Sequence, residues 1–372
     1  MIYLDNAATT AVFDECNDII REYNSLKYFN PSALYGHASG AARDLKTARE
    51  NILRHLGGLN NGNLIFTASG TEANNIALLC KSFKKYSRII ISAAEHDAVY
   101  NTAAYLKQKD FEVIICPVDG FGRVNPEELA NYADENTALV SVIHVCNETG
   151  AVNDIETSVK KVKEKSPKCL FHSDGVQAFK KIDVNVSKLG VDLYTISGHK
   201  IHAPKGVGAL YFKNGVNLNT FIHGGGQEYN IRSATENLSS IAAFSKAADI
   251  MSRKKINRQL LVGLKDFLAT EFDAIINTPD GDINNILSVA FKGIKGEVLL
   301  HALEKHDIIV GTGSACSSKK SGKRIAEALK LPENYVQGIL RISINENTNY
   351  NEILELQEKL KLEYENLSKY KS

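Results

Sequence analysis

The stretch DLYTISGHKIHAPKGVGALYF, residues 192–212, decides the fold. Two β-branched and aromatic runs in it, DLYTIS (192–197) and VGALYF (207–212), have the composition of strands. Between them stands a polar turn in which Lys200 comes directly after the first run. A lysine in that place lies at the carboxyl edge of a sheet, where open α/β sheets gather their ligands.

Further runs of the same kind lie upstream. They alternate with amphipathic stretches, which is the pattern of βα units around a mostly parallel sheet. We therefore expect an α/β fold whose large domain holds a mostly parallel seven-stranded sheet. The five upstream runs are LIFT (64–67), RIIIS (88–92), EVIIC (112–116), ALVSVIHV (138–145) and CLFHS (169–173).

The rest of the chain predicts helices and a second, smaller domain. Apolar residues at helical spacing end at Gly57, in the manner of a glycine helix end. One long helical pattern from about residue 239 to 272 is expected to bridge the domains, and LSVAF, DIIV and LRISI indicate an α+β unit. We expect a large domain at 15–255 and a small domain made of 1–14 and 256–372.

Composition excludes several classes of protein. The 372 residues are 44% hydrophobic and 23% charged with a formal net charge of +1, so the chain is neither disordered nor strongly polarised. Nucleic acid and membrane surfaces are therefore not expected as direct partners. The start MIYLDNAATT lacks the flank and apolar core of a leader, and no apolar run is long enough to span a membrane, so we expect a cytoplasmic protein.

The six cysteines are scattered without a C-x-x-C pair, which argues against zinc sites and a disulfide framework. Cys316 differs from the others because its setting, GTGSACSSKKSGKR, is rich in glycine, serine and cations. Such a loop is expected to be exposed and to stabilise a thiolate. The other five include four in apolar runs, where a cysteine serves as a small buried hydrophobe: Cys80, Cys116, Cys146 and Cys169.

Polar fragments follow five of the predicted strands and would meet at one sheet edge. Ser69-Gly70-Thr71 precedes a helical run, where free N–H groups favour an anion such as phosphate, although an ordinary N-cap gives the same pattern. A lysine such as Lys200 can form a Schiff base with a carbonyl cofactor, although a lone lysine is more often a solvated one. Asp174 could pair with a protonated pyridine nitrogen or simply form an Asp-Gly turn.

Eleven motifs together resemble the cysteine desulfurases of the NifS/IscS type, which are pyridoxal-phosphate (PLP) enzymes of fold type I in the class V aminotransferase group. The resemblance covers nearly the whole chain, and the motifs occur in the family's order. They are YLDNAATT (3–10), FNPSA (29–33), SGTEANN (69–75), AEHDAV (94–99), HVCNETG (144–150), HSDGVQ (172–177), SGHKIHAPKGVGALY (197–211), HGGGQE (223–228), RSATEN (232–237), GSACSS (313–318) and LRIS (340–343).

The resemblance implies a role for each motif residue. Lys200 would be the Schiff-base lysine, Asp174 the partner of the pyridinium nitrogen, and His96 a ring-stacking acid or base that acts on the substrate thiol. Arg341 would bind the substrate carboxylate together with Asn147 and Asn30. The other implied cofactor contacts are Gln177 to the phenolic oxygen, Gly70, Thr71, Ser197 and His199 to the phosphate, and Thr235 to the phosphate of the other subunit of a homodimer.

The implied reaction takes sulfur from L-cysteine as a persulfide on Cys316 and leaves alanine. A sulfur-acceptor protein would follow, in iron–sulfur cluster assembly, tRNA thiolation or a thiamine pathway. Two departures from the family pattern bear on this: Cys146 stands where the family has asparagine, and the segment after Cys316 is basic and slightly shorter. They leave the acceptor open.

Three other functions remain open from the sequence. A selenocysteine lyase on the same fold would use the same cofactor residues without depending on Cys316. A true aminotransferase would need a keto-acid acceptor, and the cysteine in GSAC argues against it. A non-catalytic scaffold is the third, since fold alone never establishes activity.

Overall fold

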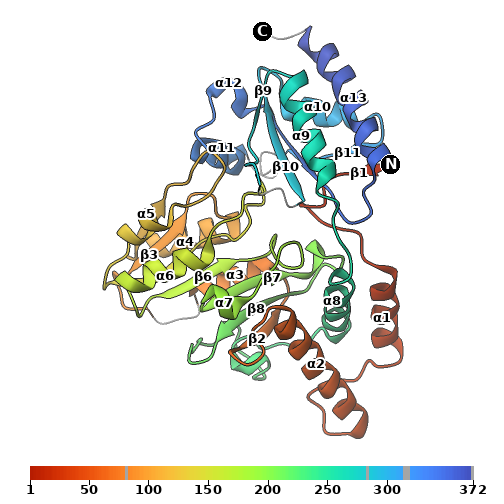
Figure 1. Cartoon of the computed structure of the whole chain (residues 1–372). Helices are drawn as coiled ribbons and strands as arrows, with labels where there is room; N and C mark the ends of the chain where they lie inside the picture. Colours follow the sequence, from red (N-terminus) through yellow and green to blue (C-terminus); the bar gives the residue numbers. More distant parts are fainter. Residues whose placement is uncertain (80–82, 282–284, 313–318, 370–372) are drawn as a thin grey trace.

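The structure is a computed structural model that describes residues 1–79, 83–281, 285–312 and 319–369 (Figure 1). Its largest element is a seven-stranded sheet in the order β2-β8-β7-β6-β5-β3-β4. Only β8 runs against its neighbours, because β8 pairs antiparallel with both β2 and β7 while the other pairings are parallel. The strands are β2 (Gly62–Thr67), β3 (Arg88–Ser92), β4 (Glu112–Cys116), β5 (Thr137–Ser141), β6 (Leu170–Asp174), β7 (Leu193–Ser197) and β8 (Gly208–Lys213).

Helices cover both faces of this sheet because strand side chains alternate between two apolar clusters. Ile65, Ile89 and Ile91 join one cluster with α3 (Gly70–Leu79) and α4 (Asp97–Lys107). Leu64, Phe66 and Ile90 join the other. That second face is covered by α2 (Gly36–His55), α5 (Pro126–Asn131), α6 (Ile155–Lys165) and α8 (Leu238–Met251), with α1 (Asp14–Ser25) and α7 (Val186–Leu189) beside them.

A third apolar cluster lies outside this sheet and joins the two ends of the chain. It contains β1 (Ile2–Tyr3), which pairs in parallel with β11 (Ile308–Ile309), and the antiparallel sheet β12-β10-β9. These clusters are the basis on which we propose the domain division at residues 14/15 and 255/256. The remaining elements are α9 (Gln259–Glu271), β9 (Ala274–Ile276), β10 (Ile286–Phe291), α10 (Gly296–Glu304), α11 (Lys319–Ala328), α12 (Glu333–Val336), β12 (Ile339–Ser343) and α13 (Tyr350–Ser368).

The expected α/β fold with a mostly parallel seven-stranded sheet is confirmed, but two expected elements have other bounds. The predicted helix at 239–272 is wrong, because α8 ends at Met251 and α9 begins at Gln259. The two helices bury their apolar sides in different clusters, so the chain breaks at the cationic run between them. The predicted strand 138–145 ends at Ser141, and beyond it the N–H of Ile143 donates to the Glu95 carboxylate.

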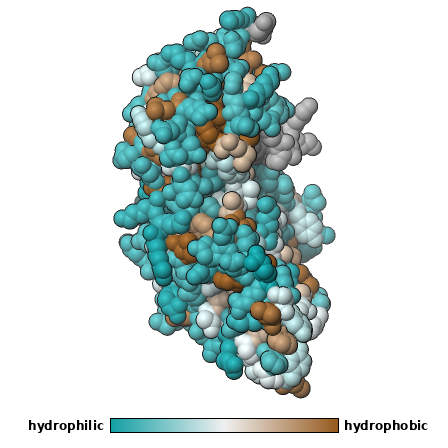
Figure 2. All heavy atoms as spheres, turned by 90° about the vertical axis from the view of Figure 1, so that its right-hand side faces the viewer, coloured by the Kyte–Doolittle hydropathy of each residue, from teal (hydrophilic) through white to brown (hydrophobic). Residues whose placement is uncertain are grey.

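The surface is mostly hydrophilic on the face seen in Figure 2, with apolar side chains in small separate groups. Several apolar atoms gather at its lower end, the end at which Figure 1 places the connection between α1 and α2. That connection holds the exposed side chains of Leu26, Tyr28, Leu34 and Tyr35. Within the described ranges, every helix is too short or too polar to cross a membrane.

Candidate active site

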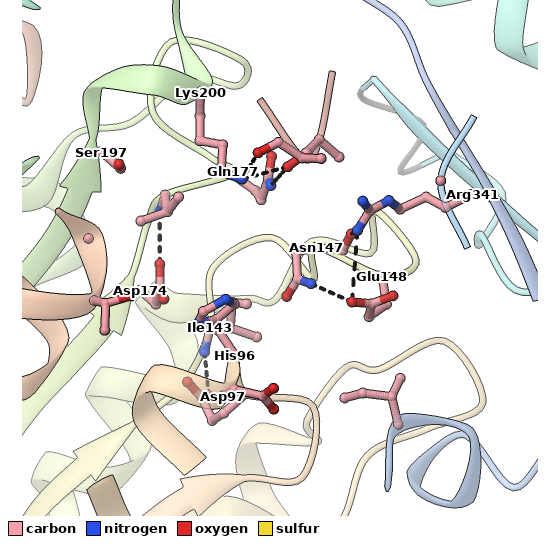
Figure 3. A pocket seen from close by; sticks show the side chains of 18 of the residues that line it. His96, Asp97, Ile143, Asn147, Glu148, Asp174, Gln177, Ser197, Lys200 and Arg341 are labelled. Carbon is pink, nitrogen blue, oxygen red and sulfur yellow. Dashed lines mark hydrogen bonds and ion pairs between the residues drawn. The ribbon is translucent and has the colours of Figure 1, made fainter. Parts of the chain in front are cut away.

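A cavity of about 480 Å³ lies at the carboxyl edge of the large sheet. It is lined by residues of the large sheet and its loops, and by residues of the part of the chain around the third apolar cluster, here called the small unit. The loops after β2, β3, β5, β6 and β7 converge there, as ligand sites of open α/β sheets do. Figure 3 shows Lys200 and Gln177 on one side of the open space and Arg341 on another, with Asp174 and His96 below them. The structure thus brings together residues from seven of the eleven sequence motifs.

Lys200 ends the short 3-10 turn Gly198–Lys200 that follows β7. Its ammonium donates to the carbonyl oxygens of Ala7 and Ala8, at 2.7 and 2.6 Å. Burial and the nearby Arg341 lower the pKa of Lys200 to about 8, and the carboxylate of Asp5 opposes that shift. A lysine with this pKa is about one tenth free amine at pH 7, far more than an ordinary lysine, which suits a nucleophile toward an aldehyde.

Asp174 is the last residue of β6, and its side chain is buried. One carboxylate oxygen accepts from the Asn74 amide at 2.7 Å, and the other accepts from the N–H of Val176 at 3.0 Å. These bonds hold the Asp174 side chain in one orientation at the floor of the cavity. The arrangement fits the partner of a protonated ring nitrogen.

His96 is the N-cap of α4 and is exposed in the mouth of the cavity. Its Nδ1 accepts from the N–H of Ala98 at 3.1 Å. In the neutral imidazole the proton therefore lies on Nε2, since one ring nitrogen accepts and the other donates. This fixes which nitrogen His96 can offer to a ligand.

Gln177 is held by bonds to both ends of its amide. Its Nε2 donates to Ala7 O at 2.8 Å, and its Oε1 accepts from the ammonium of Lys181 at 2.6 Å. Lys181 is buried, and burial followed by the charges of Lys200 and Arg341 lowers its pKa well below the usual value. The remaining N–H of the amide can serve an oxygen acceptor in the cavity.

The other end of the cavity has the character of a phosphate site. The hydroxyl of Ser197 is buried and has no hydrogen-bond partner among the described residues. Gly70 begins α3 beside it, and a Cβ on Gly70 would lie 2.9 Å from Val176 and 3.3 Å from Ser197. The first N–H groups of a helix lack intrahelical partners and attract anions. His199 lines the same region, and burial lowers its pKa to about 4.

Arg341, on β12, crosses from the small unit to the far wall of the cavity. Its guanidinium donates to Asn147 O at 2.9 Å and pairs with Asp5 at 3.0 Å, while Glu148 lies 3.8 Å away. Its buried Nε has no hydrogen-bond partner in the described part of the chain. The guanidinium thus retains one N–H donor, on Nε, for a carboxylate ligand.

Two of the expected site residues do not line this cavity, and a third cannot be placed. Asn30 and Thr235 are exposed and do not line the cavity of this chain. Cys316 lies outside the described residues. The structure also adds residues that the sequence did not single out, namely Asp5, Glu95 and Lys181, and it places Arg324, which the sequence indicated only as a cation near Cys316, in the cavity wall. Asp5 belongs to the motif YLDNAATT and Glu95 to AEHDAV, and this is the one sequence feature that could have indicated them.

The fold and this cavity define an α/β enzyme of fold type I, with a lysine after β7 and an acid at the end of β6. The protein-family model described as "Aminotransferase class-V" matches residues 2–356, so the chain belongs to that family.

Within the family, the chain is similar to proteins named for one activity. It is 34% identical to "Cysteine desulfurase IscS" of Dictyoglomus turgidum, over 100% of this chain and 97% of that protein. It is 37% identical to "Cysteine desulfurase" of Trichormus azollae, over 92% and 88%. The solved structure of a "NIFS-LIKE PROTEIN" matches with a TM-score of 0.89 at 33% identity, over 98% of this chain and 99% of that one.

Proposed function

We propose that this enzyme is a cysteine desulfurase that uses pyridoxal 5'-phosphate to move the sulfur of L-cysteine onto Cys316 and releases L-alanine. The similar proteins named above support the activity. One solved neighbour, 27% identical with a TM-score of 0.83, is described as bound to cysteine. The observation that carries the proposal is the convergence of Lys200, Asp174, His96 and Arg341 on one cavity.

The cavity fits the cofactor at both of its ends. The unpartnered hydroxyl of Ser197 and the start of α3 at Gly70 suit a phosphate, with Thr71 and His199 beside them. Asp174 suits a pyridinium nitrogen, and the free N–H of Gln177 suits a phenolic oxygen. Asn147 lines the same cavity and completes the proposed set of cofactor contacts.

Bound pyridoxal phosphate supplies an electron sink that stabilises negative charge at the substrate's α-carbon. Around it, Arg341 binds and orients the substrate carboxylate, with Asn147 nearby. The Lys200 amine, whose pKa lies near 8, can hold and return the α-proton. Carbonyl oxygens of Ala7 and Ala8 keep that amine in place between these tasks.

The sulfur step needs a nucleophile and a proton donor. Neutral His96 carries its proton on Nε2, since Nδ1 accepts from Ala98, and it can donate that proton at the substrate. The Cys316 thiolate then attacks the substrate sulfur, so that an S–S bond forms as the C–S bond breaks. The bonding pair of the broken bond stays with the substrate carbon, which takes up a proton and becomes the methyl group of alanine.

A homodimer and a sulfur-acceptor protein are parts of the same proposal. Asn30 and Thr235 are exposed and do not line the cavity of their own chain, so they are available to the site of a second copy. The acceptor would be a scaffold for iron–sulfur clusters, a tRNA-thiolation enzyme or a carrier of a thiamine pathway. A cytoplasmic location is also proposed, because Cys16, Cys116, Cys146 and Cys169 are buried free thiols.

Incubation of the cofactor-loaded protein with L-cysteine, followed by intact-mass measurement and an assay for alanine, tests the proposal. We expect one added sulfur atom on wild type, mapped by peptide analysis to Cys316, together with free alanine. Cys316→Ser should retain the cofactor and lose the adduct, because a hydroxyl is a far weaker nucleophile toward sulfur. Near-normal alanine release by that variant would favour the selenocysteine lyase alternative, which activity on selenocysteine would then establish.

A further inference from the structure

Arg324, on α11 of the small unit, reaches across to the loop of the large sheet that presents His96. Its guanidinium donates to Ala93 O and Glu95 O, each at 2.8 Å, and to the Asp97 carboxylate at 3.1 Å. The two carbonyls and the carboxylate stand on both sides of His96 in the chain. No role in the reaction described above uses this contact.

The contact is largely enclosed. The Arg324 side chain is only 16% exposed, and its guanidinium lies 4.2 Å from the centroid of the Tyr100 ring. The next residues of α11, Ile325 and Ala326, are buried, so the helix that carries Arg324 is itself seated. Figure 1 shows α11 beside the part of the sheet domain that contains β3 and α4.

An arginine is suited to this position because three acceptors must be satisfied at once. A planar guanidinium has five N–H donors in fixed directions and can also stack on an aromatic ring, whereas an ammonium is a point charge on a flexible stem. Buried carbonyl oxygens without donors would cost free energy and would release the backbone around His96.

We propose that Arg324 is a positioning residue that fixes the backbone on both sides of His96, so that the small unit sets the orientation of this imidazole in the cavity. The inference rests on the proposed function for the role of His96 in proton transfer. It depends on described contacts alone: Arg324 touches the loop, and the loop holds His96. Arg324 itself is not assigned a contact with the substrate.

The first test measures the loop directly, by hydrogen exchange of residues 93–100 in the cofactor-loaded protein. Arg324→Gln should raise exchange there, and Arg324→Lys should do so less because it retains one donor. The matched control is Lys323→Ala on the same helix, whose side chain is 73% exposed and pairs with Glu327 at 3.7 Å. Equal exchange in wild type and Arg324→Gln would overturn the proposal, whatever the protein catalyses.

The second test measures the consequence for desulfuration. Arg324→Gln should lower kcat about 10- to 100-fold, since small misplacements of a reacting group have effects of this size. The KM for cysteine should change less than about threefold because Arg341 and Asn147 are untouched, and Arg324→Lys should recover part of kcat. Glu327→Ala, at a residue of α11 that is 63% exposed, should match wild type. A loss confined to KM would contradict a role in positioning His96.

A double-mutant cycle with His96→Ala separates this role from general destabilisation. If Arg324 acts through His96, then Arg324→Gln should have little further effect on kcat in the His96→Ala background. The same fold-loss in both backgrounds would overturn the proposal. A wild type that releases no alanine would refute the proposed function instead, while the exchange measurement would still decide whether Arg324 holds the loop.

Discussion

Lys200 is the residue whose chemistry is most clearly set by its neighbours. Burial and the positive charge of Arg341 lower its pKa to about 8, while the carboxylates of Asp5, Asp174 and Glu148 act in the opposite direction. The ammonium form is disfavoured in the folded protein, so the free amine is present at a lower pH than for an exposed lysine. Asp5, which also pairs with Arg341, therefore raises the pKa of this amine against the effect of burial.

Removing that tuning charge gives a prediction for the cofactor-free protein. In wild type, the rate of pyridoxal-phosphate uptake should rise with pH through about 8, as the Lys200 amine loses its proton. Asp5→Asn should move this rise to lower pH, because the variant lacks a charge that raises the pKa of Lys200. Stopped-flow absorbance of the bound cofactor measures the profile. A rise at unchanged or higher pH would remove Asp5 from this role.

Glu95 is a second residue with a displaced pKa. Its side chain is fully buried, and burial raises its pKa to about 8. Between pH 5 and 8 the folded state therefore holds a proton that the unfolded state has lost, so this group makes folding less favourable as pH rises.

Glu95→Gln should remove this pH dependence, because the amide cannot ionise. Between pH 6 and 8 the unfolding free energy of wild type should fall relative to the variant by roughly 1.4 kcal/mol for each pH unit. Urea denaturation at both pH values measures the difference. The exposed Glu135→Gln should follow wild type. Parallel profiles of wild type and Glu95→Gln would show that Glu95 is ionised in the fold.

The sequence predicted the residues that act on the cofactor and substrate better than the neighbouring residues that set their charge and position. Lys200, Asp174 and His96 each follow a predicted strand within a distinctive motif, and the structure places all three in the cavity. The pairing of Arg341 with Asp5 joins positions 336 apart in the chain, and that of Arg324 with Ala93 joins positions 231 apart. No local pattern reports such contacts.

At the scale of elements, α2 is tied to the large sheet by one buried ion pair. Arg49 of α2 donates to both oxygens of the Glu228 carboxylate, at 2.6 and 2.9 Å, and to Leu64 O on β2. Glu228 also accepts from the N–H of Phe66. It begins a run of three residues with positive φ, 48°, 57° and 62°, which is backbone strain that surrounding contacts must hold in place.

Breaking this pair should destabilise the protein strongly. Arg49→Met leaves the Glu228 carboxylate buried, 4% exposed and without its cation, and we expect a loss of about 3–5 kcal/mol in unfolding free energy. Arg49→Met combined with Glu228→Gln should recover much of that loss, because the uncompensated charge is gone. Urea unfolding of the two variants measures both effects. A single variant as stable as wild type would show that the strained turn is held by other contacts.

Element prediction succeeded where local pattern and burial agree. Six of the seven strands of the large sheet were expected near their observed bounds, because each is a short apolar run between polar loops, while the strand expected at 138–145 ends at Ser141. The break between α8 and α9 was missed, since apolar periodicity continues through both helices while their partners differ. The short β9 was also missed, because its three residues are only half-buried and carry a weak signal.

At the scale of the whole molecule, the active-site cavity lies between the large sheet and the small unit. Two residues expected at the site, Asn30 and Thr235, lie instead on the outer surface. Exposed apolar side chains around Leu34 and Tyr35 accompany Asn30 in the connection between α1 and α2. A second copy of the chain would cover such a surface and would bring Asn30 and Thr235 to a cavity that is not their own. This exposed surface, with Asn30 and Thr235, is the structural reason for proposing a homodimer.

Mixing two inactive variants tests whether sites are shared. Lys200→Ala lacks its own lysine, and the double variant Asn30→Ala with Thr235→Val lacks the groups expected to act on the partner. Each alone should be strongly impaired in alanine release. Co-refolded in equal amounts, they should recover about a quarter of wild-type activity, since half of the random dimers hold one complete site. No recovery in a mixture shown to form heterodimers would place Asn30 and Thr235 outside the partner's site.

The pairing of β1 with β11 has a consequence for synthesis on the ribosome. Ile2 and Tyr3 leave the ribosome long before their strand partners, Ile308 and Ile309, which are made roughly 300 residues later. At about 5–20 residues per second, that interval lasts about 15–60 s. Throughout it the seven strands of the large sheet can emerge and assemble, since β8 ends at Lys213. The nascent enzyme should therefore form its large sheet, with Lys200 in place, well before Arg341 is synthesised. During that time β1 has no strand partner, because β11 has not yet been made.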